Sequence, residues 1–372
     1  MPKKLKIGLV LDDTLDTPDG VQQYVLTLGG WLASKGHTVH YLVGKTKRND
    51  IPNIHSLANN VKVSFNQNKM SIPYNANTKN IKKTLDNLNL DVLHIQMPYN
   101  PLFAGKVINA IDSKVAVIGT FHIAPASWLV SAGGRALRLS YYKSIKRFDE
   151  IIAVSQAAKD FASKNFKINS VVIPNVVDIN KYLRKPVSNK TVHIVYLGRL
   201  VQRKGCVWLL RALNELKNMQ GINYSVTIAS SGPLMAKLKK YVVKNGLSNV
   251  EFIGYVDEKD KPGLLSSADI AVFPSTGGES FGIVLIEAMA AGSRVVLGGD
   301  NEGYRTVLGD YPNQLVNPKD TKLFSELLYR YINNPQDRIN AFNWNQKNVK
   351  KYDINIVGQD IEKIYYKHKQ LT

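Results

Sequence analysis

Two glutamates lie eight residues apart in a glycine-rich stretch that runs from Gly277 to Gly292. Glu279 lies between Gly-Gly and Ser-Phe-Gly, and Glu287 falls within the helix that the next residues predict. The apolar run Asp269 to Pro274 predicts a buried strand before this stretch. A glycine-rich loop and a helix N-terminus can bind phosphate, and two carboxylates can bind different hydroxyl groups of one polyol. Two solvated glutamates are the alternative, but the glycine flanks favour a ligand site.

A second strand, loop and helix carries basic residues. The run His193 to Leu197 predicts a strand, and the loop Gly198 to Gly205 contains Arg199 and Lys204 before a predicted helix. Arginine can bind phosphate oxygens in a bidentate manner, and lysine adds a point charge. The loop therefore predicts an anion site, whereas Arg203 is expected to be solvated, as many basic residues of this chain would be.

The first half of the chain offers a histidine at the end of a strand. Val115 to Ile118 predicts a buried strand, and His122 follows it closely. Ligands of α/β sheets bind at the carboxyl ends of strands, so His122 is a candidate site residue, whereas His94 lies within a strand and is expected in the core. The adjacent Asp12 and Asp13 would face opposite ways along a strand, and no metal site is expected.

Composition limits the classes of function. Apolar runs alternate with helical patterns over 372 residues of 44% hydrophobic composition, which predicts parallel α/β sheets in two domains. The net charge is +20 and favours polyanionic partners, but no base-reading motif is present, so nucleic acid is not expected. One cysteine, Cys206, fits a reducing cytosol, and the N-terminus lacks the pattern of a signal peptide.

Together these motifs resemble the retaining family 4 glycosyltransferases of the GT-B fold, and most of all their phosphatidyl-myo-inositol mannosyltransferase branch. Glu279 and Glu287 match the Glu-x7-Glu motif of that family, and the resemblance covers nearly the whole chain. The chain departs from the family at Asp19 and Val176, where the family motifs have glycine. It also has Lys79 and Asn80 near the position of an arginine that binds the acceptor's phosphate in relatives.

The resemblance implies a role for each site residue. His122 would lie beside the transferred sugar, Glu279 would hold its hydroxyl groups, Arg199 and Lys204 would bind the diphosphate, and Glu287 would hold the ribose. The other donor-binding residues that it implies are Gly20, Gly232, Val256, Lys261, Ser280, Phe281, Gly282, Ile283 and Val284. The acceptor-binding residues that it implies are Gln22, Tyr74, Asn75 and Lys79.

The resemblance also implies an architecture and a reaction. Two doubly wound Rossmann-like domains, 1–180 and 181–354, would face each other across a cleft, with a helix at about 355–372 packing back on the first. The expected reaction transfers a hexose, mannose, from a nucleotide diphosphate sugar, GDP-mannose, to a lipid-linked or glycan acceptor, with no metal and no other cofactor. A basic helix over Lys79, Lys82 and Lys83 would dock on anionic lipid at the cytoplasmic membrane face, as in lipid-modifying relatives, whereas three lysines alone fit a solvated surface helix at least as well.

Other functions fit part of the same evidence. A soluble-glycan glucosyltransferase that uses a UDP- or ADP-sugar is the alternative within the enzyme class. A non-catalytic partner subunit that binds a nucleotide sugar is the second alternative, and Asp19 and Val176 are its sequence support. A nucleic-acid-binding protein is suggested by charge alone and ranks last.

Overall fold

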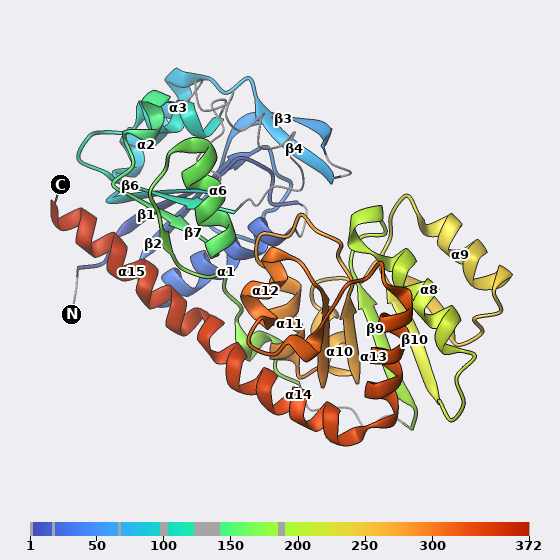
Figure 1. Ribbon diagram of the computed structural model, residues 1–372. Coiled ribbons are helices and arrows are strands. Elements are labelled where there is room, and N and C mark those ends of the chain that lie inside the picture. Colours follow the sequence, from blue (N-terminus) through green and yellow to red (C-terminus); the bar gives the residue numbers. More distant parts are fainter. Residues whose placement is uncertain are drawn as a thin grey trace. The chain divides into compact units, whose positions relative to one another are not determined.

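The computed structural model describes residues 3–16, 19–65, 68–96, 103–122, 142–184 and 190–371. The chain divides into two compact units, which Figure 1 colours along the sequence. The first unit comprises Met1–Val176 and Ile354–Thr372, and the second comprises Val177–Asp353. Each unit is built around its own sheet.

The first unit contains an eight-stranded sheet in the order β4-β3-β2-β1-β5-β6-β7-β8. Its neighbouring strands are parallel, except that β3 and β4 form an antiparallel pair. The strands are β1 (Lys6–Leu11), β2 (Thr38–Gly44), β3 (Ile54–Phe65), β4 (Asn68–Tyr74), β5 (Val92–Gln96), β6 (Ala116–Phe121), β7 (Glu150–Ala153) and β8 (Val171–Val172). The central strands β1, β5 and β6 are almost wholly buried, as parallel strands with covered faces must be.

Helices cover both faces of this sheet. Helix α1 (Gly20–Ser34) and the C-terminal helix α15 (Ile354–Leu371) share one apolar cluster with alternate residues of β1 and β2. Helices α2 (Thr78–Leu88) and α3 (Phe103–Ala110) share a second apolar cluster with the strand residues that alternate with those of the first cluster. A Cβ atom on Gly358 would lie 2.8 Å from the Trp31 ring, so the absence of a side chain there lets α15 approach α1 closely. The short α5 (Tyr142–Ile145) and α6 (Gln156–Phe166) complete the unit.

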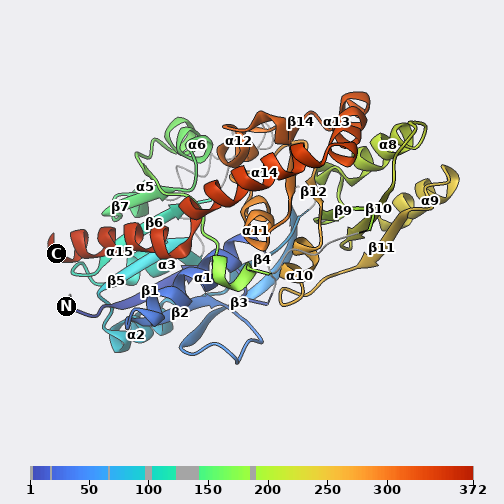
Figure 2. The same ribbon diagram turned by 90° about the horizontal axis from the view of Figure 1, so that it is seen from below.

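The second unit contains a six-stranded parallel sheet in the order β11-β10-β9-β12-β13-β14. Its strands are β9 (Val192–Leu197), β10 (Tyr224–Ala229), β11 (Val250–Gly254), β12 (Ile270–Phe273), β13 (Val295–Gly299) and β14 (Leu315–Val316). Its helices are α7 (Ile179–Tyr182), α8 (Cys206–Leu216), α9 (Met235–Lys244), α10 (Lys261–Ser266), α11 (Ile283–Ala291), α12 (Glu302–Leu308), α13 (Thr321–Asn333) and α14 (Pro335–Asn348). Figure 2 shows α8 and α13 next to each other over this sheet. Leucines of both helices belong to the apolar core of this unit.

Each sheet has one point at which the strand order reverses. In the first unit this point lies between β1 and β5, and in the second it lies between β9 and β12. Doubly wound sheets bind ligands outside the carboxyl ends of the strands at such points. The doubly wound α/β fold that the sequence predicts is therefore confirmed in each unit. Within the described part of the chain, no helix has both the length and the hydropathy needed to cross a bilayer.

Candidate functional site

The two loops predicted to bind a ligand meet at the reversal point of the second unit. One loop follows β9 and the other follows β12, and the backbone N–H of Thr276 donates to the carbonyl oxygen of Arg203 at 2.8 Å. Gly205 adopts φ 77°, and a Cβ atom there would lie 1.8 Å from the carbonyl oxygen of Pro274. Only glycine permits this approach, which brings the basic loop against the acidic loop.

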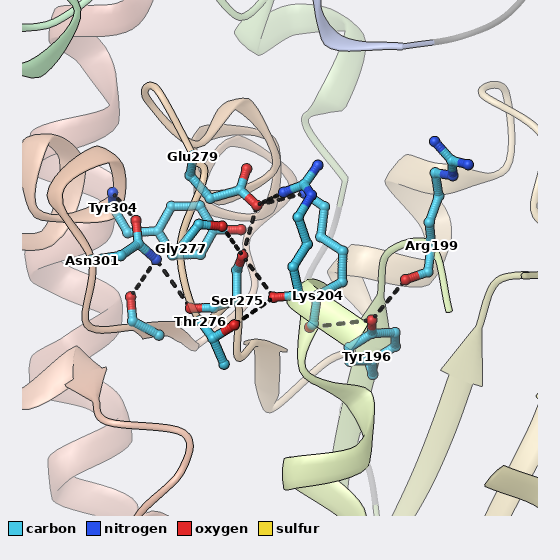
Figure 3. Close-up of polar contacts among 11 residues, drawn as sticks. Tyr196, Arg199, Lys204, Ser275, Thr276, Gly277, Glu279, Asn301 and Tyr304 are labelled. Carbon is cyan, nitrogen blue, oxygen red and sulfur yellow. Dashed lines mark hydrogen bonds and ion pairs between the residues drawn. The ribbon is translucent and has the colours of Figure 1, made fainter. Parts of the chain in front are cut away.

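Glu279 is the centre of a charged cluster between these loops, shown in Figure 3. Its Oε1 atom accepts hydrogen bonds from Arg203 Nη1 at 2.7 Å, from Lys204 Nζ at 2.9 Å and from Ser275 Oγ at 2.7 Å. The side chain of Glu279 is 12% exposed. Its Oε2 atom makes no hydrogen bond with any residue that the structure describes, so one carboxylate oxygen can accept from a ligand.

The protonation state of Glu279 follows from this cluster. Burial raises the pKa of the carboxyl group, but Lys204 and Arg203 outweigh burial and lower the pKa to about 2. Glu279 is therefore a carboxylate at neutral pH and cannot serve as a general acid there. It can accept hydrogen bonds from hydroxyl groups.

The acid dependence of stability gives a first test. A pKa that is lower in the folded protein stabilises the fold above the unfolded value of 4.5, and this stabilisation is lost as pH falls towards 2. We expect the difference in unfolding free energy between wild type and Glu279→Gln to shrink by about 3 kcal/mol between pH 5 and pH 2. Urea unfolding at both pH values measures this difference, and a pH-independent difference would contradict the ion-paired state of Glu279.

One arginine of the basic loop differs from expectation, and the role of a second stays untested. Arg203 is not solvated as the sequence suggested, because its guanidinium pairs with Glu279 and its side chain is only 21% exposed. The Arg199 side chain points away from Glu279 and Lys204 in Figure 3, while its carbonyl oxygen lies 3.3 Å from the Tyr196 hydroxyl. The structure thus brings together Lys204, Arg203 and Glu279, and a role for Arg199 in binding the diphosphate stays a prediction.

Glu287 forms a second buried cluster in the same unit. Helix α11 places it where Lys261 Nζ lies 3.0 Å from Oε1 and 3.2 Å from Oε2, and the Tyr182 hydroxyl donates to Oε1 at 2.6 Å. Burial lowers the pKa of Lys261, but the carboxylates of Glu287 and Glu258 outweigh it, so the net shift is upward. Burial, together with Glu287, raises the pKa of Tyr182, which stays protonated. Lys261 and Glu287, both predicted from sequence, are therefore neighbours, and Tyr182 was missed.

Helix α11 begins at the acidic loop and points its N-terminus towards it. Gly282 is the N-cap at φ 108°, and a Cβ atom there would lie 2.7 Å from the ring of Tyr304. Ser280, Ile283 and Val284 beside it are half-buried, whereas Phe281 is buried with its ring edge against Tyr352. The helix terminus thus adds a partial positive charge beside Glu279.

The remaining predicted donor residues of this unit lie in two nearby turns. A Cβ atom on Gly232 would lie 2.6 Å from the carbonyl oxygen of Leu200, so this turn contacts the basic loop directly. Val256 follows β11, is half-buried and precedes the Glu258–Lys261 pair. A role for either residue in donor binding stays a prediction.

In the first unit, His122 is buried at the carboxyl edge of the sheet. Its Nε2 lies 2.8 Å from Gln96 Oε1, and its ring stands edge-on to Tyr24 at 4.9 Å. Burial lowers the pKa of His122 to about 3, so its imidazole is neutral at physiological pH. His94 is fully buried, which confirms its assignment to the core.

The start of α1 carries the other predicted residues of this edge. Gly20 is the first residue of α1, and the buried Gln22 hydrogen-bonds the side chain of Asp13. Burial raises the pKa of Asp13 to about 6, and the charge of Asp19 adds to the rise. Asp19 is exposed, and its side chain makes no capping hydrogen bond. The preceding Thr17 and Pro18 lie outside the described residues.

The predicted acceptor residues Tyr74, Asn75 and Lys79 lie in the same unit, at the end of β4 and in α2. Tyr74 is 48% exposed, Asn75 adopts φ 51°, and Lys79 is exposed in the first turn of α2. None of the three has a hydrogen bond to His122 or Gln22 among the described contacts. Their role in acceptor binding stays a prediction.

No group of three His, Cys, Asp or Glu side chains in the described part of the chain is arranged to hold a metal ion. The charged groups that could bind an anionic ligand are instead the cations of the basic loop.

Two family models match this chain. A model described as glycosyl transferases group 1 matches residues 178–349, and a model described as glycosyltransferase family 4 matches residues 18–181. The chain is similar to a phosphatidyl-myo-inositol mannosyltransferase of Mycolicibacterium smegmatis, with 30% identity over 97% of this chain and 93% of that protein. A protein of the same name from Propionibacterium freudenreichii is 32% identical over 78% of this chain and 76% of its own length.

Solved structures share the fold at low sequence identity. A glycosyltransferase from Rickettsia africae has a TM-score of 0.77 at 19% identity, covering 98% of this chain and 99% of that one. A sucrose-phosphate synthase from Thermosynechococcus elongatus has a TM-score of 0.75 at 18% identity, covering 99% of this chain and 100% of that one. An Anabaena protein solved with UDP and glucose has a TM-score of 0.73 at 16% identity, covering 97% and 99%.

Proposed function

Because the chain belongs to the family 4 glycosyltransferases and has the two-domain GT-B fold, we propose that it transfers mannose from GDP-mannose to a phosphatidylinositol-type lipid with retention of configuration. The observation that carries this proposal is the cluster of Arg203, Lys204 and Glu279 at the reversal point of the second sheet. The names of the full-length relatives support mannose and a phosphatidylinositol acceptor.

The proposed chemistry depends on stabilising the leaving diphosphate. As the glycosidic bond breaks, negative charge develops on the diphosphate, and preorganised cations at a low-dielectric site stabilise it. Lys204 and Arg203, with the N-terminus of α11, supply that charge in the second unit. These cations would do the work of a metal ion, so we expect no metal requirement.

Glu279 and Glu287 would bind the two carbohydrate parts of the donor. The Oε2 atom of Glu279 would accept from hydroxyl groups of mannose, while Oε1 stays fixed by Arg203, Lys204 and Ser275. Glu287, held by Lys261 and Tyr182, would accept from the ribose. The neutral His122 would accept from a hydroxyl group rather than act as a cation.

We propose that the protein works as a peripheral protein at the cytoplasmic face of the membrane, held by α2. In this helix Ile81 and Leu85 are buried, whereas Lys79, Lys82 and Lys83 are exposed. Lys82 pairs with Asp86 at 2.6 Å, so Lys79 and Lys83 are the better candidates for binding lipid headgroups. Each basic residue near an anionic surface contributes about 1 kcal/mol to binding.

The double variant Lys79→Gln/Lys83→Gln should bind vesicles containing phosphatidylinositol about 10- to 30-fold more weakly than wild type at moderate salt. Sedimentation with vesicles measures the affinity. Lys240→Gln/Lys244→Gln is the matched control, because these two exposed lysines of α9 also lie one turn apart and form no ion pair within the described part of the chain. Equal losses in both double variants would show that general charge, and not α2, governs membrane binding.

A soluble-glycan glucosyltransferase remains a second candidate, because similar structures include a sucrose-phosphate synthase and a protein solved with UDP and glucose. Nucleotide release from GDP-mannose, UDP-glucose and ADP-glucose distinguishes the candidates when measured with and without phosphatidylinositol vesicles, in EDTA. We expect release from GDP-mannose that rises with lipid. Release from UDP- or ADP-glucose without lipid would favour the soluble-glycan enzyme, and nucleotide binding without release would favour a non-catalytic subunit.

A further inference from the structure

Gln96 is a buried polar residue to which the proposed chemistry assigns no role. It is the last residue of β5, and His122 directly follows β6. The two strands are parallel, with Gln96 opposite Thr120, so both side chains lie at the same carboxyl edge of the sheet. Gln96 is 0% exposed and His122 is 6% exposed.

The contact between these side chains fixes the tautomer of His122. The Gln96 Oε1 atom is a carbonyl oxygen and can only accept, so His122 Nε2 at 2.8 Å carries the hydrogen. A neutral imidazole has one N–H, so Nδ1 is left as an acceptor. Among the residues that the structure describes, none forms a hydrogen bond with His122 Nδ1.

The amide nitrogen of Gln96 carries two N–H groups that can donate hydrogen bonds. Gln96 Nε2 is buried and has no hydrogen-bond partner within the described ranges of the chain. Buried polar groups are nearly always hydrogen-bonded in folded proteins, so a buried amide nitrogen without a partner indicates a place for a ligand or water. The nitrogen that needs an acceptor belongs to the same amide whose oxygen holds His122.

A second set of buried groups fixes the plane of the His122 ring. Tyr24 meets this ring edge-on at 4.9 Å, with 74° between the planes. The Tyr24 hydroxyl hydrogen-bonds Thr120, whose hydroxyl oxygen lies 2.6 Å from His94 Nε2. His94 Nδ1 in turn lies 2.6 Å from the Tyr365 hydroxyl of α15. Tyr24, which these hydrogen bonds hold in place, therefore limits rotation of the His122 ring out of its plane.

We propose that Gln96 is a substrate-binding residue that also positions His122, so that the two side chains offer one donor and one acceptor to the hydroxyl groups of a carbohydrate ring. One hydroxyl would donate to His122 Nδ1, and the oxygen of a second hydroxyl would accept from Gln96 Nε2. The proposal rests on the proposed glycosyl transfer. The hydroxyl groups belong either to the transferred hexose or to the acceptor.

The tautomer can be measured without any substrate. Long-range proton–nitrogen NMR of the ¹⁵N-histidine-labelled protein reports which ring nitrogen is protonated, and loss of a signal in His122→Asn assigns His122. We expect Nε2–H at pH 7 in wild type. In Gln96→Glu, a carboxylate beside the ring should raise the pKa of His122 and add a proton at Nδ1. An Nδ1–H tautomer in wild type, or unchanged His122 signals in Gln96→Glu, would overturn the positioning role.

Activity measurements test the substrate contact. We expect Gln96→Met to lower kcat/KM for nucleotide release from GDP-mannose by about 10- to 100-fold, the loss expected for one or two hydrogen bonds. In Gln96→Glu, activity should recover as pH rises, because deprotonation of His122 restores the Nδ1 acceptor. The pH–activity profile of wild type should lack this rise. Gln156→Met, at an exposed position of α6, is the control and should behave as wild type.

The two sources of the hydroxyl groups give different results. A loss in Gln96→Met during donor hydrolysis without lipid assigns the contact to the transferred hexose, and a loss only with phosphatidylinositol vesicles assigns it to the acceptor. The proposal would be overturned if Gln96→Met lost less than twofold in activity in both assays while His122→Asn was impaired. Wild type inactive with every donor would instead contradict the proposed function, and the tautomer measurement would still decide whether Gln96 positions His122.

Discussion

Replacing Lys204 with alanine should lower kcat by about 10²- to 10³-fold, the loss seen when one preorganised charge-stabilising donor is removed from an active site. Lys204 Nζ lies 2.9 Å from Glu279 Oε1, which holds the ammonium group in the charged cluster. The Lys204 side chain is 22% exposed, so a ligand can reach it. The interaction with the diphosphate grows as the glycosidic bond breaks. We therefore expect kcat and kcat/KM to fall by similar factors, with little change in the KM for the nucleotide sugar.

Single-turnover and steady-state rates of nucleotide release measure this effect. Lys363→Ala removes a lysine that is 73% exposed in α15 and serves as the matched control. Lys204→Ala should retain most of its fold, because Arg203 and Ser275 still contact Glu279. A kcat within twofold of wild type in a folded Lys204→Ala variant would remove Lys204 from the catalytic machinery.

Replacing Glu279 with glutamine should lower kcat/KM by about 10²-fold, because the amide keeps the shape of the side chain but loses its charge. Hydrogen bonds to a charged acceptor are about twice as strong as neutral ones, so the contact between Oε2 and a sugar hydroxyl weakens. The substitution also leaves Arg203 and Lys204 without the carboxylate that holds them in place. Both effects act on the transition state for departure of the diphosphate.

Circular dichroism and urea unfolding separate these kinetic effects from loss of fold. Glu326→Gln, on the exposed face of α13, is the matched control. Loss of one partner from a buried ion pair costs about 3–5 kcal/mol, so Glu279→Gln should unfold more easily than wild type at pH 7. A variant that is destabilised but turns over at the wild-type rate would make Glu279 a structural residue of the loop.

The sequence predicted residues of the donor-side site where local chemistry determines the structure. Glycines at Gly277 to Gly292 and at Gly205 specify turns that bring two loops together. Lys204 and Glu279 lie on those loops, and Glu287 lies in the helix that follows the second loop. Strands predicted from apolar runs were correct to within a few residues; for example, the run His193 to Leu197 forms β9, Val192–Leu197. The family assignment followed from the order of these motifs.

The missed features depend on contacts between distant residues. In the sequence, nothing distinguishes Arg203 from a surface arginine. Its ion pair with Glu279, which is distant in the chain, forms only in the folded structure. Tyr182 lies in a short helix after the first unit, and only packing of α7 against α11 brings its hydroxyl to Glu287. Gln96 follows the mostly apolar run Asp91 to Ile95, at a strand end where α/β sheets bind ligands, but its bond to His122 depends on the pairing of β5 with β6.

One element was missed although the sequence contains a signal for it. The long β3 and its antiparallel partner β4 were not predicted, yet Val61, Val63 and Phe65 alternate with polar residues as a strand requires. Val176, which replaces a motif glycine, is buried in the first core, where an apolar side chain packs without strain. This departure therefore has a structural explanation and gives no support to a non-catalytic protein.

The most direct test of the proposed function is to identify the product. Purified protein is incubated with GDP-mannose and phosphatidylinositol vesicles, and the lipid fraction is analysed by mass spectrometry and by proton NMR of the anomeric centre. We predict a lipid heavier by one hexose, with the new mannose in the α configuration of the donor. An unmodified lipid, from a folded protein that binds GDP, would contradict lipid mannosylation, and a β-linked product would contradict retention.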